Sequence, residues 1–313
     1  MILHTLMPLF TGPAQPQEMS KRHDSLIDWL QSPGFDALKS TCGERTSITA
    51  YFPGKELHIP HKEHPDAMKV SFPPNMGASV PKGFIARMHL LYLLYLIEYS
   101  DGGKTKAEYQ SKTIFACIDG SGAFNFDSLT LLVDAFAQDP DVDVVLGRRP
   151  PDYSGMIPGR KEIEEFEQYL LFHSRPTQIK AAFAKYDLRD GLLPDGQAGC
   201  WAFRLRCSHR LPLTANGYEI EYDLLSSAIE SQLKVAYTEP LPMPRVPRHS
   251  SASTQAIEMS IRKLDFIGCK LNLTRGDIVH AWQDFAIRFA GTDIMNNILP
   301  GYEEALLRTY GTK

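Results

Sequence analysis

The sequence predicts an α/β protein with a mainly parallel mixed sheet, helices flanking that sheet, and a helical segment at its C-terminal end. A clear strand–helix–strand unit over residues 113–147 is the first observation behind this prediction. Short apolar runs also alternate with helical patterns over about 150 residues, which is typical of parallel sheets covered by helices. From about residue 255 onward the pattern is helical throughout.

Each expected element follows from its local pattern. Short runs rich in β-branched and aromatic residues predict strands at residues 2–10, 46–54, 67–72, 113–119, 142–147 and 234–242. Apolar residues at helical spacing predict helices at residues 23–32, 83–99, 126–138, 162–173, 218–232 and from 255 on. Pro33 and Gly34 are expected to end the first helix. We expect one domain over residues 1–254 and a helical extension over residues 255–313.

Composition limits the classes of function. A net charge of −4 argues against a general nucleic-acid binder, which is normally basic. The five cysteines are scattered without CxxC spacing, which favours reduced thiols in a cytoplasmic protein. The most apolar run, residues 84–97, is shorter than the roughly 20 residues that span a bilayer. We therefore expect a soluble cytoplasmic protein, with peripheral attachment to a membrane left open.

Polar residues stand where two predicted strands end. Asp119 follows one strand, and Gly147, Arg148 and Arg149 follow the next. Ligands of open α/β sheets bind beyond the carboxyl ends of the strands, so these residues are candidates for a site. Two plainer interpretations stay open: Asp119 as a turn residue of an Asp-Gly-Ser-Gly segment, and the two arginines as solvated loop charges.

Four segments together resemble a known family: "NMGASVPKGFIARMHL", "FACIDGSGAFNFDSLTLLVDAF", "DVDVVLGRRP" and "DGQAGCWAFR…NGYEIEYDLLSSAIESQLKVAYTEPLP". Their order is similar to that of inverting family 2-like glycosyltransferases with the Rossmann-like GT-A fold, and the nearest subgroup is the dolichyl- or polyprenyl-phosphate sugar synthases. The resemblance covers roughly residues 1–254. It implies transfer of a sugar from a nucleotide-sugar donor to an acceptor that the sequence does not identify, with inversion.

The resemblance also implies roles for individual residues. The implied donor-binding residues are Pro8, Asn75, Gly77, Asp119, Arg148, Arg149 and Gln197. The implied catalytic carboxylates are Asp195, Glu219 and Glu221, and the implied acceptor-binding residues are Arg248 and Ser253. If the acceptor is a hydroxyl, a carboxylate should take its proton, with Asp195 the first choice and Glu219 the second. A phosphate acceptor would need no base.

One departure from the family pattern concerns the metal. The family holds Mg²⁺ or Mn²⁺ at a D-x-D strand end, but here Cys117 stands in place of the first acid and Asp119 remains. A neutral thiol is a poor ligand for these hard cations. We therefore expect weaker binding of a divalent cation at Asp119, or charge compensation by Arg148, Arg149 or Arg160, since guanidinium groups suit phosphate oxygens.

Two other functions remain open. A non-catalytic GT-A-like binding protein with a degenerate metal site would explain Cys117. A sugar nucleotidyltransferase normally has a glycine-rich loop after its first strand. This chain has "LFTGPAQPQEMSKR" there, with a single glycine, which counts against that function. The expected partners are a nucleotide-sugar donor and a small-molecule or lipid-phosphate acceptor. The C-terminal helices are expected to pack on the main domain; a homo-oligomer contact through them is an alternative.

Overall fold

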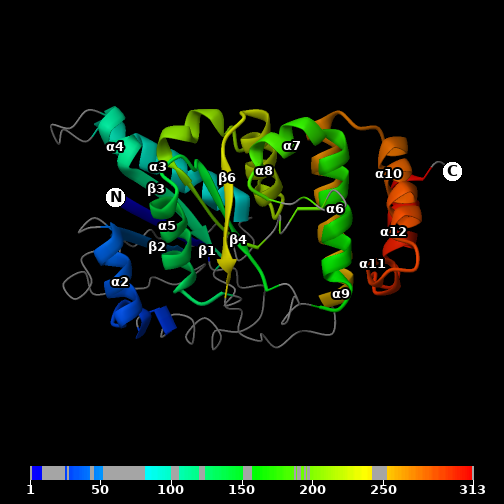
Figure 1. The fold of residues 1–313 in the computed structure, drawn as a ribbon, viewed down its shortest axis with the longest axis horizontal. Helices are drawn as coiled ribbons and strands as arrows, with labels where there is room; N and C mark the ends of the chain where they lie inside the picture. The colour runs from blue at the N-terminus through cyan, green and yellow to red at the C-terminus, as the bar shows by residue number, and fades with distance from the viewer. Residues whose placement is uncertain are drawn as a thin grey trace, which may run out of the picture.

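The computed structural model describes residues 2–8, 25–26, 28–42, 46–51, 82–99, 106–119, 124–150, 157–186, 188, 192–193, 195, 198–241 and 252–311. Its centre is a twisted sheet with helices on both sides (Figure 1). The predicted strand at residues 67–72 lies outside the described residues.

The sheet of the described residues is six-stranded, in the order β2-β1-β3-β5-β4-β6. Its strands are β1 (Ile2–Pro8), β2 (Thr46–Tyr51), β3 (Thr113–Ile118), β4 (Val144–Arg148), β5 (Cys200–Arg204) and β6 (Val235–Pro240). Strand β5 runs antiparallel between β3 and β4, and the other neighbouring strands are parallel. The prediction of a mainly parallel mixed sheet is confirmed.

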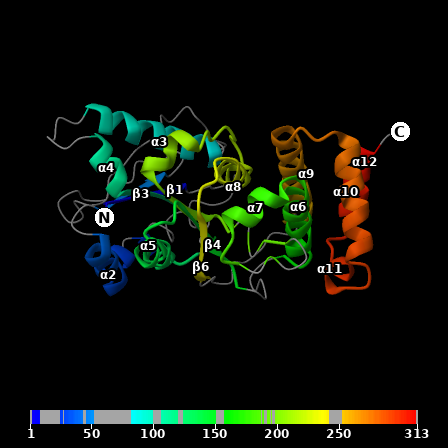
Figure 2. The ribbon, with the colours of Figure 1, turned by 45° about the horizontal axis from the view of Figure 1, so that its top comes forward.

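Helices cover both faces of this sheet. The helices of the described residues are, in chain order, α2 (Pro33–Cys42), α3 (Lys82–Tyr99), α4 (Lys106–Lys112), α5 (Ser128–Gln138), α6 (Arg160–Ser174), α7 (Pro176–Ala182), the 3₁₀ helix η3 (Leu205–Arg210), α8 (Ile220–Glu230), α9 (Ala252–Leu271), α10 (Arg275–Arg288), α11 (Asp293–Asn296) and α12 (Tyr302–Tyr310). Helices α2 and α5 lie on one side of the strands and α3 and α8 on the other (Figure 2).

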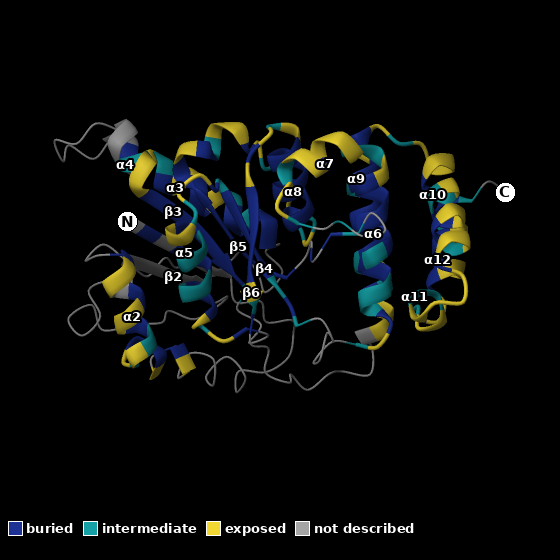
Figure 3. Cartoon of the chain, viewed as in Figure 1, coloured by how far each residue is buried: buried dark blue, intermediate teal, exposed yellow. Residues whose placement is uncertain are grey.

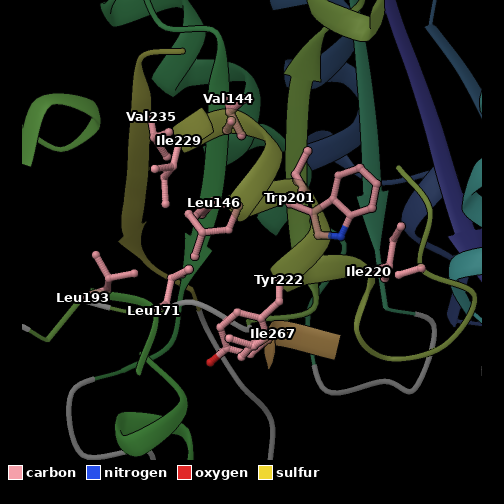
Figure 4. Close-up of a cluster of buried hydrophobic side chains, with 14 of the residues drawn as sticks. Val144, Leu146, Leu171, Leu193, Trp201, Ile220, Tyr222, Ile229, Val235 and Ile267 are labelled. Atoms are coloured by element: carbon pink, nitrogen blue, oxygen red, sulfur yellow. The ribbon is translucent and has the colours of Figure 1, made fainter. Parts of the chain in front are cut away.

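Strand β3 shows why the sheet has two cores. Successive side chains of a strand point to opposite faces, so Phe115 and Cys117 join the α3 and α8 side while Ala116 and Ile118 join the α5 side. The described side chains of β3 are buried, and exposed residues concentrate on the outer faces of the helices (Figure 3). Figure 4 shows part of the larger core, in which strand residues pack against three helices. The strand residues are Val144, Leu146, Trp201 and Val235, and the helix residues are Leu171 of α6, Ile220, Tyr222 and Ile229 of α8, and Ile267 of α9.

The C-terminal helices belong to the same buried cluster as the sheet. Phe166 of α6 lies 5.0 Å from Trp282 of α10 in an edge-to-face contact, and Phe285 and Tyr302 complete the aromatic group. Such pairs add about 0.5–1.5 kcal/mol each beyond burial. The predicted helical C-terminal segment is therefore confirmed: its first helix, α9, packs on α6 and α8, and α10 packs on α6. The domain boundary at residue 254 and the homo-oligomer contact stay predictions.

Two local expectations were incomplete. The predicted first helix does end before Pro33, but Pro33 then opens α2, because proline is well suited to the first position of a helix. Strand β5 was not predicted at all, because its pairing with β3 and β4 depends on residues far away in the chain. Within the described residues, no helix combines the length and apolar character needed to cross a bilayer.

Candidate functional site

Asp119 lies at the carboxyl edge of the sheet, directly after β3. Because β5 is antiparallel to β3, the start of β5 meets this same edge, with Ile118 opposite Cys200. The Asp119 amide donates to the carbonyl oxygen of Gly199 at 2.8 Å. Gly199 has a φ of +74°, and a Cβ there would lie 3.3 Å from the Cβ of Asp119. A glycine therefore lets the chain pass close beside the carboxylate.

A buried lysine lies between two acids at this edge. The ammonium of Lys82, the first residue of α3, is 2.6 Å from Oε1 of Glu221 in the first turn of α8 and 4.0 Å from Oδ2 of Asp119. The lysine side chain is 2% exposed and that of Asp119 is 24% exposed. Asp119 is thus the member of this trio that can best reach a bound molecule.

The segment before α8 fixes Lys82 in place. The amides of Gly83 and Phe84 donate to the carbonyls of Gly217 and Asn216 at 3.2 and 2.9 Å. A Cβ on Gly83 would lie 2.4 Å from the carbonyl oxygen of Ala215, so only glycine allows this approach.

Asp223 holds that same segment from the helix side. Its carboxylate accepts hydrogen bonds from the amides of Thr214 and Ala215 and lies 2.9 Å from the ammonium of Lys270. The start of α3 is therefore positioned by α8 and, through Lys270, by α9.

Electrostatics favour the charged form of Lys82. Burial would lower the pKa of Lys82, but the opposite charges of Glu221 and Asp119 outweigh it and raise the pKa above its ordinary value. Burial raises the pKa of the Cys117 thiol to about 12, only partly opposed by Lys82. Cys117 is thus a neutral thiol, wholly buried on the α3 side of β3.

Tyr218 lies on the rim of this site and was not predicted. Burial, and next the charge of Asp119, raise the pKa of its phenol, while Lys82 and Arg160 lower it. Its side chain is nevertheless among the exposed large hydrophobic groups. Its exposed aromatic surface, within electrostatic range of Asp119, Lys82 and Arg160, is of the kind that stacks against a ring.

A second charged cluster lies at the end of β4. The guanidinium of Arg149 donates to both carboxylate oxygens of Asp195, at 2.8 and 2.6 Å, and contacts Glu164 of α6 at 2.5 Å. The Arg149 amide also donates to Asp195 at 2.9 Å. Arg160 donates to the other oxygen of Glu164 at 2.9 Å.

All three members of the Arg149–Glu164–Asp195 group are buried. Burial would raise the pKa of Glu164, but Arg149 and Arg160 bring it down to about 2. The solvated-loop interpretation of Arg149 is therefore wrong. Because Arg149 is buried and bound to two carboxylates, it presents no open face to a diphosphate.

The other predicted site residues fall in three groups. Arg148 is half-buried, 3.9 Å from the exposed Glu239, and Glu219 is the residue before α8, with its carboxylate against Gly217. Pro8 ends β1 and Ser253 is exposed at the start of α9. Outside the described residues lie Asn75, Gly77, Gln197 and Arg248.

The side chains around Asp119 could bind a divalent cation only together with ligands from another molecule. Within the described part of the chain, no three His, Cys, Asp or Glu side chains cluster closely enough to hold a metal ion. Asp119 offers one accessible carboxylate, and Glu221 is already paired with Lys82. Mg²⁺ is commonly bound by one or two carboxylates together with substrate phosphates. Asp119 would fit that arrangement if the phosphates of a bound ligand completed the shell.

Sequence reasoning missed Lys82 and Glu164. A lysine in the first turn of a helix opposes the helix dipole, so Lys82 before an apolar helix was a signal that an acid lies nearby. Glu164 lies in the acidic run of α6, for which no role was predicted from the sequence. Its neighbours Ile163 and Phe166 are buried, which indicates that part of this run faces inward.

Gly199→Ala is expected to destabilise the protein by about 1–3 kcal/mol, because alanine is strained at this positive φ. It should also weaken ligand binding at Asp119, since the new Cβ presses on that side chain. Gly291→Ala is the matched control: Gly291 has the same φ of +74° but nothing within 4 Å of its Cβ position. The control loses stability through the φ strain alone, so urea unfolding should show a larger loss for Gly199→Ala, and an equal or smaller loss would contradict the effect of the Asp119 contact.

Comparison with known proteins gives fold-level likeness only. No protein-family model matches the chain, and no curated protein sequence matches it. Among solved structures it is similar to glucosyl-3-phosphoglycerate synthase from Mycobacterium tuberculosis in complex with phosphoglyceric acid, at 15% identity and a TM-score of 0.48, covering 87% of this chain and 80% of that chain. The same enzyme with Mn²⁺, uridine diphosphate and glucosyl-3-phosphoglycerate gives 13% identity and a TM-score of 0.48 over the same shares. At these values the likeness assigns no activity to this chain.

Proposed function

We propose that the chain is a GT-A-type glycosyltransferase that moves a sugar from a nucleotide-sugar donor to an acceptor, with inversion. The convergence of Asp119, Lys82 and Glu221 at the carboxyl edge of the sheet is the observation that carries this proposal. That edge is where open α/β sheets bind nucleotides. The start of α3 also lies there, and a helix N-terminus favours anionic groups.

The reaction would be a direct displacement at the anomeric carbon. An acceptor oxygen forms a bond to that carbon while the bond to the diphosphate oxygen breaks. A divalent cation held by Asp119 would supply charge stabilisation for the departing diphosphate. The chain's own contribution is to position the donor and to offer fixed charges where negative charge develops.

The predicted catalytic carboxylates differ in accessibility. Asp195 is buried and accepts three hydrogen bonds from Arg149, and Glu221 is paired with Lys82. Glu219 is half-buried just before α8 and does not share this burial. If the acceptor is a hydroxyl, we therefore assign the proton-accepting role to Glu219 and a positioning role to Asp195.

Calorimetric titration with UDP, GDP, dTDP and CMP in the presence of Mn²⁺ tests the proposed donor class. We expect one of the nucleotides to bind, and Asp119→Ala to weaken that binding by about tenfold or more, since one close charge contact to a ligand contributes about 1.5–3 kcal/mol. Release of nucleoside diphosphate from the matching sugar nucleotide then tests transfer chemistry.

Asp141→Ala is the matched control, because Asp141 is an exposed acid paired with Lys234 away from this edge. It should leave nucleotide binding unchanged. If the folded protein binds no nucleotide, the glycosyltransferase proposal fails and the non-catalytic alternative takes its place.

A further inference from the structure

The positive charge between Asp119 and Glu221 is already supplied by the protein. Lys82 is anchored by the 214–217 segment through the backbone of α3, and its ammonium lies against Glu221 and near Asp119. In many acid-lined sites a divalent cation fills such a place, because two carboxylates together attract it. Here the place between the acids is occupied by a buried side chain.

We propose that Lys82 is a resident cation which prevents the Asp119 site from holding a divalent metal by itself, so that metal and nucleotide bind there together. This inference rests on the proposed function. It is argued from the donor set: Glu221 is engaged by Lys82, Cys117 is a buried thiol, and Asp119 provides one carboxylate with an ammonium 4.0 Å away. That ammonium repels a second cation, whereas a diphosphate would add both negative charge and oxygen ligands.

Two of the three nearby arginines are already engaged by buried acids. Arg149 is bound to Asp195 and Glu164, and Arg160 is bound to Glu164. Arg148 is directed toward Glu239 at 3.9 Å. The diphosphate therefore has most to gain from bringing its own metal, and binding of the two should be strongly coupled.

Coupling of this kind is reciprocal. Whatever factor Mn²⁺ adds to nucleotide affinity, the nucleotide must add to Mn²⁺ affinity, typically about 5- to 150-fold. A site with two free carboxylates would behave differently, because it would bind Mn²⁺ before any nucleotide arrives.

The test measures Mn²⁺ binding to the full chain by the loss of the free-ion electron paramagnetic resonance signal, with and without the nucleotide that the calorimetric panel identifies. The wild type should bind Mn²⁺ at Asp119 only with nucleotide present, and nucleotide affinity should fall by about tenfold or more in EDTA. Asp119→Asn should abolish the coupling. Mn²⁺ binding to the wild type alone that Asp119→Asn removes would overturn the inference, as would nucleotide affinity that is equal in EDTA and in Mn²⁺.

Lys82→Met tests the role of the lysine directly, since Asp119 and Glu221 then become a two-carboxylate site. In the absence of nucleotide, this variant should bind Mn²⁺ about ten times more tightly than the wild type does. Unchanged Mn²⁺ binding in a folded sample would contradict the inference.

Cys117→Asp adds a carboxylate beside the same site and should also gain Mn²⁺ binding, with Cys117→Ser as its neutral control. If no nucleotide binds under any condition, the proposed function fails, and the Mn²⁺ titration of the protein alone still decides whether Lys82 excludes the metal.

Discussion

Arg149→Met is expected to lower the free energy of unfolding by about 3–5 kcal/mol, because it leaves two buried carboxylates without their partner. Arg149 makes three hydrogen bonds to Asp195 and contacts Glu164, and each of the three residues is less than one-tenth exposed. Methionine keeps much of the side-chain volume, so the loss reports charge and hydrogen bonding more than packing. Urea unfolding followed by circular dichroism measures the change.

Arg148→Met is the matched control one residue earlier in the chain. Its guanidinium lies 3.9 Å from an exposed Glu239, and a pair of this kind contributes about 0–1 kcal/mol. A similar loss of stability in both variants would show that the Arg149 cluster is not a special feature of the fold.

The pH dependence of stability offers a second readout of the same cluster. The pKa of Glu164 in the folded protein is about 2, below its ordinary value of 4.5. A lowered carboxyl pKa adds stability that is fully present above pH 4.5 and is lost as the pH falls toward 2. This acid-labile component should be smaller in Arg149→Met, because the first of the cations that lower the pKa of Glu164 is then missing while Arg160 and Lys263 remain.

The sequence predicted those parts of the fold whose pattern is local. Strand β3, helix α5 and strand β4 were expected within a few residues, because apolar periodicity and turn residues mark each of them. Strand β5 could not be found in this way, since its place in the sheet is set by antiparallel pairing with β3 and β4. Pairing between distant segments leaves little trace in a single sequence.

The candidate site residues also fall into those that local sequence predicted and those that depend on a distant partner. Asp119 and Glu221 were expected from their position after a strand and at a helix start, and the structure brings them to either side of Lys82. Their catalytic and metal-binding roles stay predictions. Lys82 and Glu164 were missed because nothing local separates a buried lysine or glutamate from a solvated one; only the partner across the fold does.

The two charged clusters use their charges differently. In the Arg149 cluster the guanidinium is buried together with both of its acids. Its charge therefore serves to hold Glu164 of α6 and the distant Asp195 against the end of β4. In the Lys82 cluster one acid, Asp119, stays partly open to solvent. A cluster that keeps one open acid can act on a bound molecule, and we therefore place the donor site at Asp119 rather than at Arg149.

Lys82→Met is expected to lower the free energy of unfolding by about 3–5 kcal/mol and to let the proposed donor site bind Mn²⁺ without nucleotide. Its partner Glu221 is 8% exposed and would keep a buried charge with no counter-charge at 2.6 Å. Lys234→Met is the matched control, since Lys234 is 2.9 Å from Asp141 but both side chains are exposed, and its loss should stay below about 1 kcal/mol.

The double variant with Lys82→Met and Glu221→Gln separates charge from packing. If the cost of Lys82→Met arises from the uncompensated carboxylate, removing that carboxylate should restore part of the stability, with a coupling of about 1–3 kcal/mol between the two sites. Additive losses would instead mean that the stem of Lys82 stabilises the start of α3 by packing alone. In that case the charge of Lys82 would not stabilise Glu221. The proposal that Lys82 keeps a free metal ion out of the site would then be contradicted.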